Sequence, residues 1–212
     1  MTDTTKQAGP AIVFDFGRVL VDWDPRYLYR KLIPGGPQAI DSFLQEVHFY
    51  DMVRLQDAGV PVSETVAEWC RRYPQRCELL HAYDKRYEES IVGPIWGTVE
   101  IMKALKQAGY SLYGLSNWPA DKFRLVRHKY EFFGWLDDIV ISGEVGMAKP
   151  DERIFHLLLE RIGRPASACL FIDDSLHNIT AARQLGFQTI QFSSPQALRE
   201  ELTQSIGVDV CA

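Results

Sequence analysis

Short apolar segments alternate with segments of helical periodicity along most of this 212-residue chain, and this alternation limits the fold more than any other feature. Each apolar segment is rich in β-branched or aromatic residues and ends at or beside a polar residue, as buried strands do. Parallel strands need long crossover connections, so the alternation predicts an α/β fold with a doubly wound parallel sheet, a Rossmann-like core. The predicted strands are residues 11–16, 111–116, 138–142, 168–173 and 187–192, and the predicted helices between them are residues 98–108, 120–130, 151–162 and 176–185.

The stretch from residue 23 to residue 94 breaks this alternation, because it shows helical periodicity and no convincing strand. We expect it to form an all-helical cap, inserted after the first strand and lying over the edge of the sheet. Residues 11–22 and 95–206 would then form a discontinuous core. Helices of the cap are expected over residues 26–32, 38–47, 63–73 and 75–90, with Ser63 as an N-cap.

The composition excludes several classes of protein. Apolar residues make up 46% and charged residues 24%, which is usual for a globular protein. No run approaches the roughly 18 to 20 apolar residues of a membrane-spanning helix, and the opening MTDTTKQAGP lacks the apolar region of a secretory signal. The net charge of −5, with scattered basic residues, argues against a nucleic-acid partner. A cytoplasmic monomer or homodimer is expected, with four free thiols at Cys70, Cys77, Cys169 and Cys211.

Polar residues with catalytic potential lie where four predicted strands end. In an open parallel sheet, ligands bind outside the carboxyl ends of the strands, so these residues should meet in one pocket. An aspartate in such a place is commonly a helix cap or a turn residue, but four coincidences favour a functional site. The residues are Asp15, the pair Ser116 and Asn117, Lys149, and the pair Asp173 and Asp174.

Three carboxylates in one small pocket require positive charge nearby, because like charges a few ångströms apart repel strongly. Lys149 supplies one positive charge. Carboxylate oxygens and a main-chain carbonyl are the ligands that Mg²⁺ favours when phosphate completes its coordination. The predicted pocket therefore suits the chemistry of phosphate esters.

Four segments resemble, in order, the motifs of the haloacid dehalogenase-like hydrolase superfamily. Their spacing, from Ala11 to about Phe192, is similar to that of members whose helical cap follows the first strand. FDFGRVLVD at residues 14–22 resembles the nucleophile motif, LSNW at 115–118 the Ser/Thr motif, KPDERIF at 149–155 the lysine motif and FIDDSLHNITAA at 171–182 the metal motif.

The resemblance implies a Mg²⁺-dependent phosphatase that acts on a small phosphorylated metabolite. Asp15 would attack phosphorus to form an aspartyl-phosphate, Ser116 would bind the phosphoryl oxygens, and Lys149 would neutralise charge. Asp174, with help from Asp173, would hold Mg²⁺ beside Asp15 and the carbonyl of Gly17. Gly17, Arg18 and Asn117 would contact the substrate.

One position departs from the pattern. Phosphatases of this superfamily usually carry a second aspartate two places after the nucleophile, where it acts as general acid, but this chain has Gly17 there. General acid–base assistance is worth roughly 10²- to 10⁴-fold in rate, so another group substitutes or the leaving group needs little help. Candidates for a substitute are Asp22, Asp24, His48 and His81.

Three functions fit these observations. Some bacterial members with D-x-G-x-V at this motif look similar and act on sugar phosphates. The superfamily's 2-haloacid dehalogenases also lack the second aspartate and are similar at Ser116 and Asn117, but they carry small polar residues where this chain has Asp173 and Asp174. The third function is a binding or regulatory protein with low turnover. The acidic pair favours the phosphatase, whose substrate the cap would select.

Overall fold

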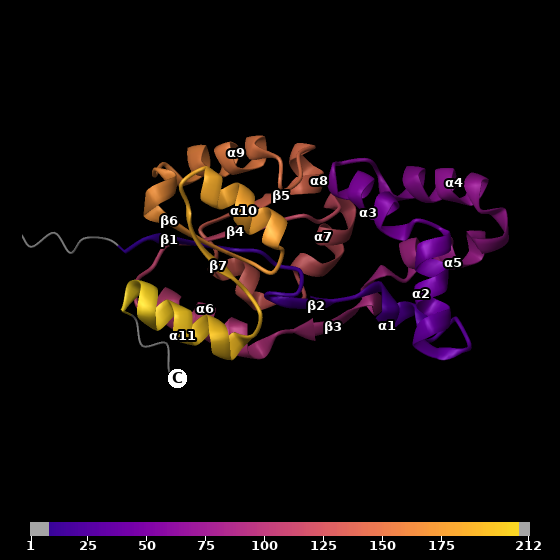
Figure 1. Ribbon diagram of the computed structural model, residues 1–212, viewed down its shortest axis with the longest axis horizontal. Coiled ribbons are helices and arrows are strands. Elements are labelled where there is room, and N and C mark those ends of the chain that lie inside the picture. Colours follow the sequence, from indigo (N-terminus) through magenta and orange to yellow (C-terminus); the bar gives the residue numbers. More distant parts are fainter. Residues whose placement is uncertain (1–8, 208–212) are drawn as a thin grey trace, which may run out of the picture.

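The computed structural model describes residues 9–207, which form a parallel sheet between two layers of helices, with a helical part to one side (Figure 1). Every neighbouring pair of strands in the main sheet is parallel. This confirms the predicted fold class, and each predicted strand is present. The strand order is β5-β4-β1-β6-β7, with β1 (Ala11–Phe14), β4 (Leu112–Ser116), β5 (Asp138–Ile141), β6 (Cys169–Asp173) and β7 (Gln188–Gln191).

Helices cover both faces of this sheet (Figure 1). Alternate residues of a strand point to opposite faces, so Ile12 and Phe14 join one apolar cluster and Val13 joins the other. The first cluster includes α6 (Trp96–Gln107) and α11 (Pro195–Ile206), and the second includes α9 (Glu152–Ile162) and α10 (Leu176–Gln184). The part of the chain that carries the main sheet has four further elements: α7 (Ala120–Arg127), η3 (Glu131–Trp135), α8 (Ser142–Val145) and η4 (Ala166–Ala168).

The helical part, which we call the helical insert, comprises residues 25–90. An antiparallel ribbon of β2 (Val21–Trp23) and β3 (Ile91–Pro94) joins it to the core. Its interior is built from aromatic rings packed edge to face, among them Tyr29, Phe49 and Tyr83. Its elements are α1 (Pro25–Tyr29), α2 (Gly36–Glu46), α3 (Phe49–Asp57), α4 (Val62–Arg72), η1 (Pro74–Arg76), α5 (Cys77–Lys85) and η2 (Tyr87–Ser90).

Several expectations for this region were wrong. Neither β2 nor β3 was predicted, because strands of three and four residues are too short to show a period. The sequence pattern also missed α3, and the helix expected over residues 75–90 is divided into η1, α5 and η2. Ser63 lies inside α4, because Pro61, with φ −55° and ψ 138°, is the N-cap and the helix already begins at Val62.

The helical insert also contacts the core away from the ribbon. Lys122 of α7 donates a hydrogen bond from Nζ to the carbonyl of Asp84 at 2.9 Å and pairs with the Asp84 carboxylate on α5. The loop after α3 touches the end of α8, where a Cβ on Gly59 would lie 3.2 Å from Cα of Gly146. The insert is therefore held at several places over the carboxyl edge of the sheet. No helix within residues 9–207 has the length and apolar character needed to cross a membrane.

The expectation of four free thiols was wrong for two of them. Cys70 and Cys77 form a disulfide, because the turn between α4 and α5 brings their Cα atoms to 4.6 Å. Cys169 is a buried free thiol, as predicted. Cys211 and the polar N-terminal tail, apart from Gly9 and Pro10, lie outside the described residues.

Gly114 in β4 is a position at which any side chain is expected to destabilise the fold. A Cβ at this residue would lie 2.7 Å from Cε1 of Phe16, which is fully buried and packed against Phe123 and Phe133. We expect Gly114→Ala to lower the free energy of unfolding by about 1–3 kcal/mol, measured by urea denaturation. Gly134→Ala is the control, because its Cβ would meet nothing within 4 Å. Equal midpoints for the two variants would contradict the packing seen at β4.

Candidate active site

The carboxyl ends of the central strands bring Asp15, Lys149 and Asp173 together, as the sequence predicts. Lys149 Nζ donates to Asp15 Oδ1 at 2.8 Å and to Asp173 Oδ2 at 2.7 Å. A third bond runs from Lys149 Nζ to the carbonyl of Leu115 at 2.8 Å. The lysine side chain is only 1% exposed, so one buried ammonium group joins the ends of three strands.

Burial and charge act in opposite directions on these groups. Burial alone lowers the pKa of Lys149, but the carboxylates of Asp15 and Asp173 outweigh it and raise that pKa. Burial raises the pKa of Asp15, Lys149 opposes this, and Asp173 adds to it. The pKa of Asp174 is also raised, by burial and then by Asp173, against the pull of Arg18. The site therefore carries more negative charge than Lys149 neutralises.

This donor set fits a hard divalent cation. Carboxylate oxygens of Asp15, Asp173 and Asp174 lie within 4.8 Å of one another. The carboxylate oxygens of Asp173 already accept hydrogen bonds from Lys149, the Ser175 amide and the Asn178 side chain. Within residues 9–207, the one ion-pair partner of the Asp174 carboxylate is the guanidinium of Arg18, at 4.0 Å. Asp174 is therefore the residue whose oxygens are most available to a cation, and Asp173 holds Lys149 and the loop in place.

The Ser/Thr motif places its two polar residues in different surroundings. The hydroxyl of Ser116 is buried and has no hydrogen-bond partner among the described residues. The amide of Asn117 is used by the backbone of Lys149, which it contacts as donor at 2.9 Å and as acceptor at 2.8 Å. Asn117 therefore positions the lysine loop, while Ser116 keeps a hydroxyl free.

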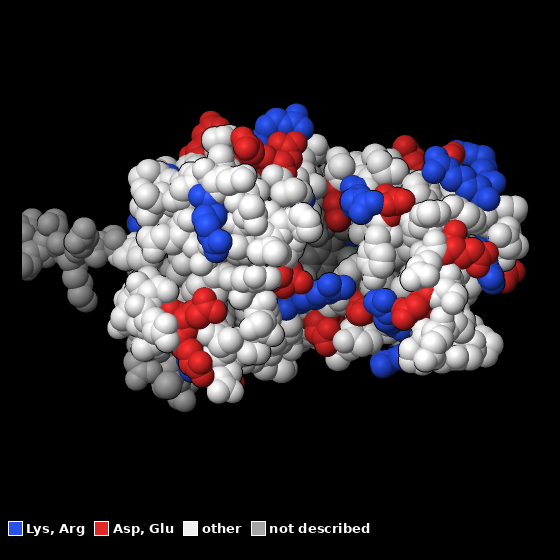
Figure 2. Space-filling model, in the orientation of Figure 1, with Lys and Arg blue, Asp and Glu red and all other residues white. Residues whose placement is uncertain are grey.

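A cavity of about 640 Å³ opens above these residues, between the core and the helical insert. Figure 2 shows this hollow, with acidic and basic side chains around its opening. Arg18 lines it with a left-handed backbone (φ 61°), a conformation that non-glycine residues adopt at a cost. The other lining residues are Asp15, Gly17, Trp23, Tyr50, Val53, Arg54, Asp57, Asn117, Lys149, Pro150, Asp174, Ser175, His177 and Asn178.

A smaller recess of about 60 Å³ adjoins this cavity. The two spaces share five lining residues: Gly17, Trp23, Val53, Asp57 and Asn117. The recess is completed by Tyr83, Tyr87, Trp118 and Pro119, so its walls are largely aromatic. Aromatic residues of the insert thus have two roles, since Tyr50, Tyr83 and Tyr87 pack the insert and also reach the cavities, together with Trp23 of β2.

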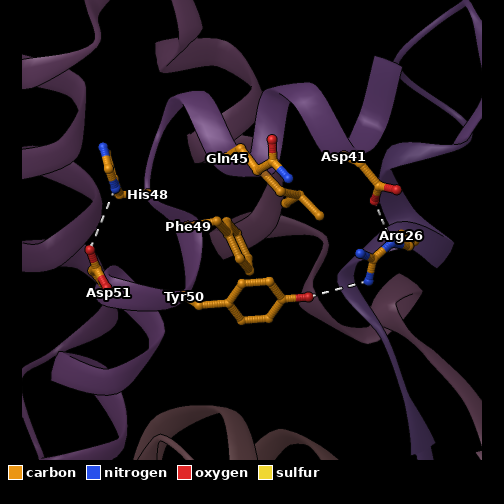
Figure 3. A pocket seen from close by; sticks show the side chains of 8 residues that line it. Arg26, Asp41, Gln45, His48, Phe49, Tyr50 and Asp51 are labelled. Atoms are coloured by element: carbon orange, nitrogen blue, oxygen red, sulfur yellow. Dashed lines mark hydrogen bonds and ion pairs between the residues drawn. The ribbon is translucent and has the colours of Figure 1, made fainter. Parts of the chain in front are cut away.

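None of the four candidates for the missing acid lines the cavity of about 640 Å³. Asp22 accepts a hydrogen bond from the Tyr27 hydroxyl, and Asp24 caps α1. His48 lies in a separate pocket, where it faces Asp51 (Figure 3). His81 lies beside the Cys70–Cys77 disulfide. The structure places all four outside this cavity, because position in the sequence does not show which side chains of the ribbon and the insert face the sheet.

Sequence reasoning missed Asp57 and Arg54, which reach the cavity from α3. No motif surrounds them, and the pattern did not predict α3 itself. A weak signal was the glycine at position 59, since a helix that ends at the sheet edge can direct its last turn into the site.

Residues 9–186 match the family described as haloacid dehalogenase-like hydrolase. The chain belongs to this family. A D-ribitol-5-phosphate phosphatase from Bacteroides thetaiotaomicron is 26% identical over 203 residues, which cover 91% of this chain and 96% of that protein. The sesquiterpene phosphatase astK from Aspergillus oryzae is 25% identical over 205 residues, covering 93% and 96%. Drimenol cyclase drtB from Aspergillus calidoustus is 26% identical over 199 residues, and the match covers 93% of this chain but only 36% of that protein.

A solved structure of a haloacid dehalogenase-like enzyme from Bacteroides thetaiotaomicron has the same fold. It superposes with a TM-score of 0.66 at 20% identity, covering 88% of this chain and 96% of that chain. That crystal holds magnesium and inorganic phosphate.

Proposed function

We propose that this haloacid dehalogenase-like hydrolase is a Mg²⁺-dependent phosphatase. It hydrolyses a small phosphate monoester through an aspartyl-phosphate intermediate. The observation that carries the proposal is the buried Lys149 ammonium between Asp15 and Asp173, beside the available carboxylate of Asp174. In this proposal residues 23–94 act as the cap, and residues 11–22 and 95–206 form the core.

The side chains of the site divide the work of the first displacement. Lys149 fixes Oδ1 of Asp15, and Oδ2 makes no hydrogen bond with any residue in the range 9–207, so it is free to attack phosphorus. The unpartnered hydroxyl of Ser116 can donate to a phosphoryl oxygen. Lys149 offsets the charge of both the nucleophile and the transferring group. Arg18 lies at the cavity wall, where it can contact the substrate.

The second displacement returns the enzyme to its starting state. Water attacks phosphorus, the bond from phosphorus to Asp15 breaks, and phosphate leaves. Asp174, Asp15 and the carbonyl of Gly17 would hold Mg²⁺, which supplies positive charge against the phosphoryl oxygens in both steps. Asp173 keeps Lys149 and the loop at residues 173–178 in position throughout.

The alcohol part of the substrate is not assigned. The names of two relatives support phosphate-ester hydrolysis but differ in the alcohol, a pentitol in one and a sesquiterpene in the other. A sugar phosphate is one candidate, because the cavity of about 640 Å³ is lined by charged and polar side chains.

A hydrolysis panel tests the proposal. Phosphate monoesters are assayed for phosphate release with Mg²⁺ and with chelator, beside a halide-release assay on 2-haloacids. We expect phosphate release that requires Mg²⁺, and no halide release. Chloride release in the presence of chelator, with no phosphatase activity under any metal, would show that the protein is a dehalogenase and not a phosphatase. A protein that binds phosphate esters without turnover would instead be the binding or regulatory protein.

A further inference from the structure

We propose that Asp57, from the helical insert, is the general acid and base that replaces the missing carboxylate at position 17. This inference rests on the proposed phosphatase function. It assigns a catalytic role to a residue of α3 and so makes the insert part of the chemistry. It also explains how a site with Gly17 can act on substrates whose leaving group needs a proton.

The position of Asp57 carries the proposal. Asp57 and Gly17 line the same two spaces, the main cavity and the aromatic recess. The carboxylate that similar phosphatases place at position 17 would therefore face the same volume as Asp57. Asp15 and Lys149 line the main cavity but not the recess, so Asp57 lies where the phosphate site passes into the recess. A leaving group bound in the recess would place its bridging oxygen near this boundary.

The Asp57 side chain is free to exchange a proton. It forms no hydrogen bond or ion pair with another residue in the described range 9–207, although it is partly buried. The other carboxylates of the cavity, Asp15 and Asp174, belong to the nucleophile and metal positions. Asp57 is therefore the one carboxylate lining the cavity, among the described residues, that the proposed mechanism leaves without a role.

Asp57 gives one proton in the first displacement and accepts one in the second, so the two displacements together leave its protonation unchanged. Asp15 attacks phosphorus, the bond between phosphorus and the leaving oxygen breaks, and that oxygen takes the proton of Asp57. The Asp57 carboxylate then accepts a proton from the attacking water as the bond between phosphorus and Asp15 breaks. The alcohol and inorganic phosphate leave, and Asp57 is protonated again.

The charged groups around Asp57 allow this cycle. Burial raises its pKa to about 7, with Lys149 lowering it and Asp15 raising it. Tyr83 and Tyr87 face it from α5 and η2, and burial raises the pKa of both phenols well above their usual value, so they stay protonated. Arg54 lies one turn earlier on α3, at the cavity wall. A carboxyl group with such a pKa can both give and take a proton near neutral pH.

The dependence of rate on the leaving group tests the proposal. The kcat/KM values of wild type and Asp57→Asn are compared over phosphate monoesters that range from 4-nitrophenyl phosphate to simple alkyl phosphates. This parameter reports the first displacement, where the acid acts. We expect Asp57→Asn to lose about 10²- to 10⁴-fold with alkyl esters and far less with 4-nitrophenyl phosphate, whose leaving group needs no proton.

Two further signatures separate catalysis from a structural effect. With 4-nitrophenyl phosphate, Asp57→Asn should release a burst of 4-nitrophenol, because the base for the second displacement is gone and the aspartyl-phosphate accumulates. With an alkyl ester, kcat/KM of the wild type should fall as pH rises through the pKa of Asp57, since the acid must be protonated. This alkaline decrease should disappear in the variant.

Matched variants complete the experiment. Asp24→Asn makes the same chemical change at the N-cap of α1, outside the cavity, and asparagine also caps helices, so we expect wild-type dependence on the leaving group. Gly17→Asp in the Asp57→Asn background should recover activity on alkyl esters, because a Cβ at position 17 would meet nothing within 4 Å. His177→Gln tests the imidazole that also lines the cavity.

The outcomes distinguish this inference from the function on which it rests. If wild type hydrolyses no phosphate ester, the proposed phosphatase fails. If wild type is active and Asp57→Asn shows an unchanged leaving-group dependence and no burst, Asp57 is not the acid. A steep dependence in His177→Gln alone would overturn the assignment in favour of the histidine.

Discussion

Replacement of Asp15 by asparagine is expected to lower kcat by about 10⁴-fold or more, because the variant keeps the shape of the side chain and loses the attacking carboxylate. Lys149 can still donate to the remaining carbonyl oxygen, so the loop that carries the lysine should stay in place. Steady-state phosphate release measures the loss. Beryllofluoride, which mimics an acyl phosphate, should bind the wild type and not the variant.

The fold of this variant should be intact. Burial raises the pKa of Asp15, so ionisation of this carboxyl opposes folding, and a neutral amide should leave the unfolding temperature equal or higher. Circular dichroism measures both points. Asp22→Asn is the control, since Asp22 belongs to the same motif but pairs with Tyr27 outside the cavity. Near-normal turnover in Asp15→Asn would refute the aspartyl-phosphate mechanism.

Removal of divalent cations is expected to abolish turnover, and added Mg²⁺ should restore it. Asp15, Asp173 and Asp174 place three carboxylates beside the single ammonium group of Lys149, which leaves excess negative charge where a phosphate dianion must bind. Without a dication, this charge repels the substrate.

A second measurement avoids dependence on activity. A ligand that binds only the folded state raises the unfolding temperature, so Mg²⁺ should stabilise the wild type. Asp174→Asn should lose most of this stabilisation and most of the turnover. Asp151→Asn, which removes a partly exposed carboxylate that caps α9, should keep both. Full activity in chelator would show that the acidic cluster serves another purpose.

The sequence predicts well which side chains meet at the carboxyl edge of the sheet, because strand ends are a topological property. Asp15, Lys149 and Asp173 lie far apart in sequence and follow or end β1, β5 and β6, and parallel pairing within the sheet requires the carboxyl ends of these strands to share one edge. The same reasoning could not find Asp57. Which face of an inserted helix meets the sheet depends on packing between the insert and the core, and no local pattern shows that packing.

The errors within the helical insert have a related cause. The expectation of free thiols at Cys70 and Cys77 was wrong, because the turn between two helices sets the distance between the two cysteines. Their spacing in the sequence does not show this distance. The ribbon of β2 and β3 is also a long-range feature, since its two strands are separated by the whole insert. Propensity and periodicity describe neighbours in sequence, and these contacts are not between such neighbours.

The ribbon also bears on how proteins of this design can diversify. Asp22 pairs with Gly93, so the chain leaves the core and returns to it on neighbouring strands. These two strands are about 5 Å apart. A foreign segment whose ends meet at that spacing could be spliced in at this single junction without changing the register of the main sheet. Such an exchange would replace the residues that meet the alcohol and, with Asp57, the proton donor matched to it. Asp15 and Lys149 would stay unchanged in the core. Selectivity for the alcohol and the pKa of the proton donor would therefore change together, whenever the insert is exchanged.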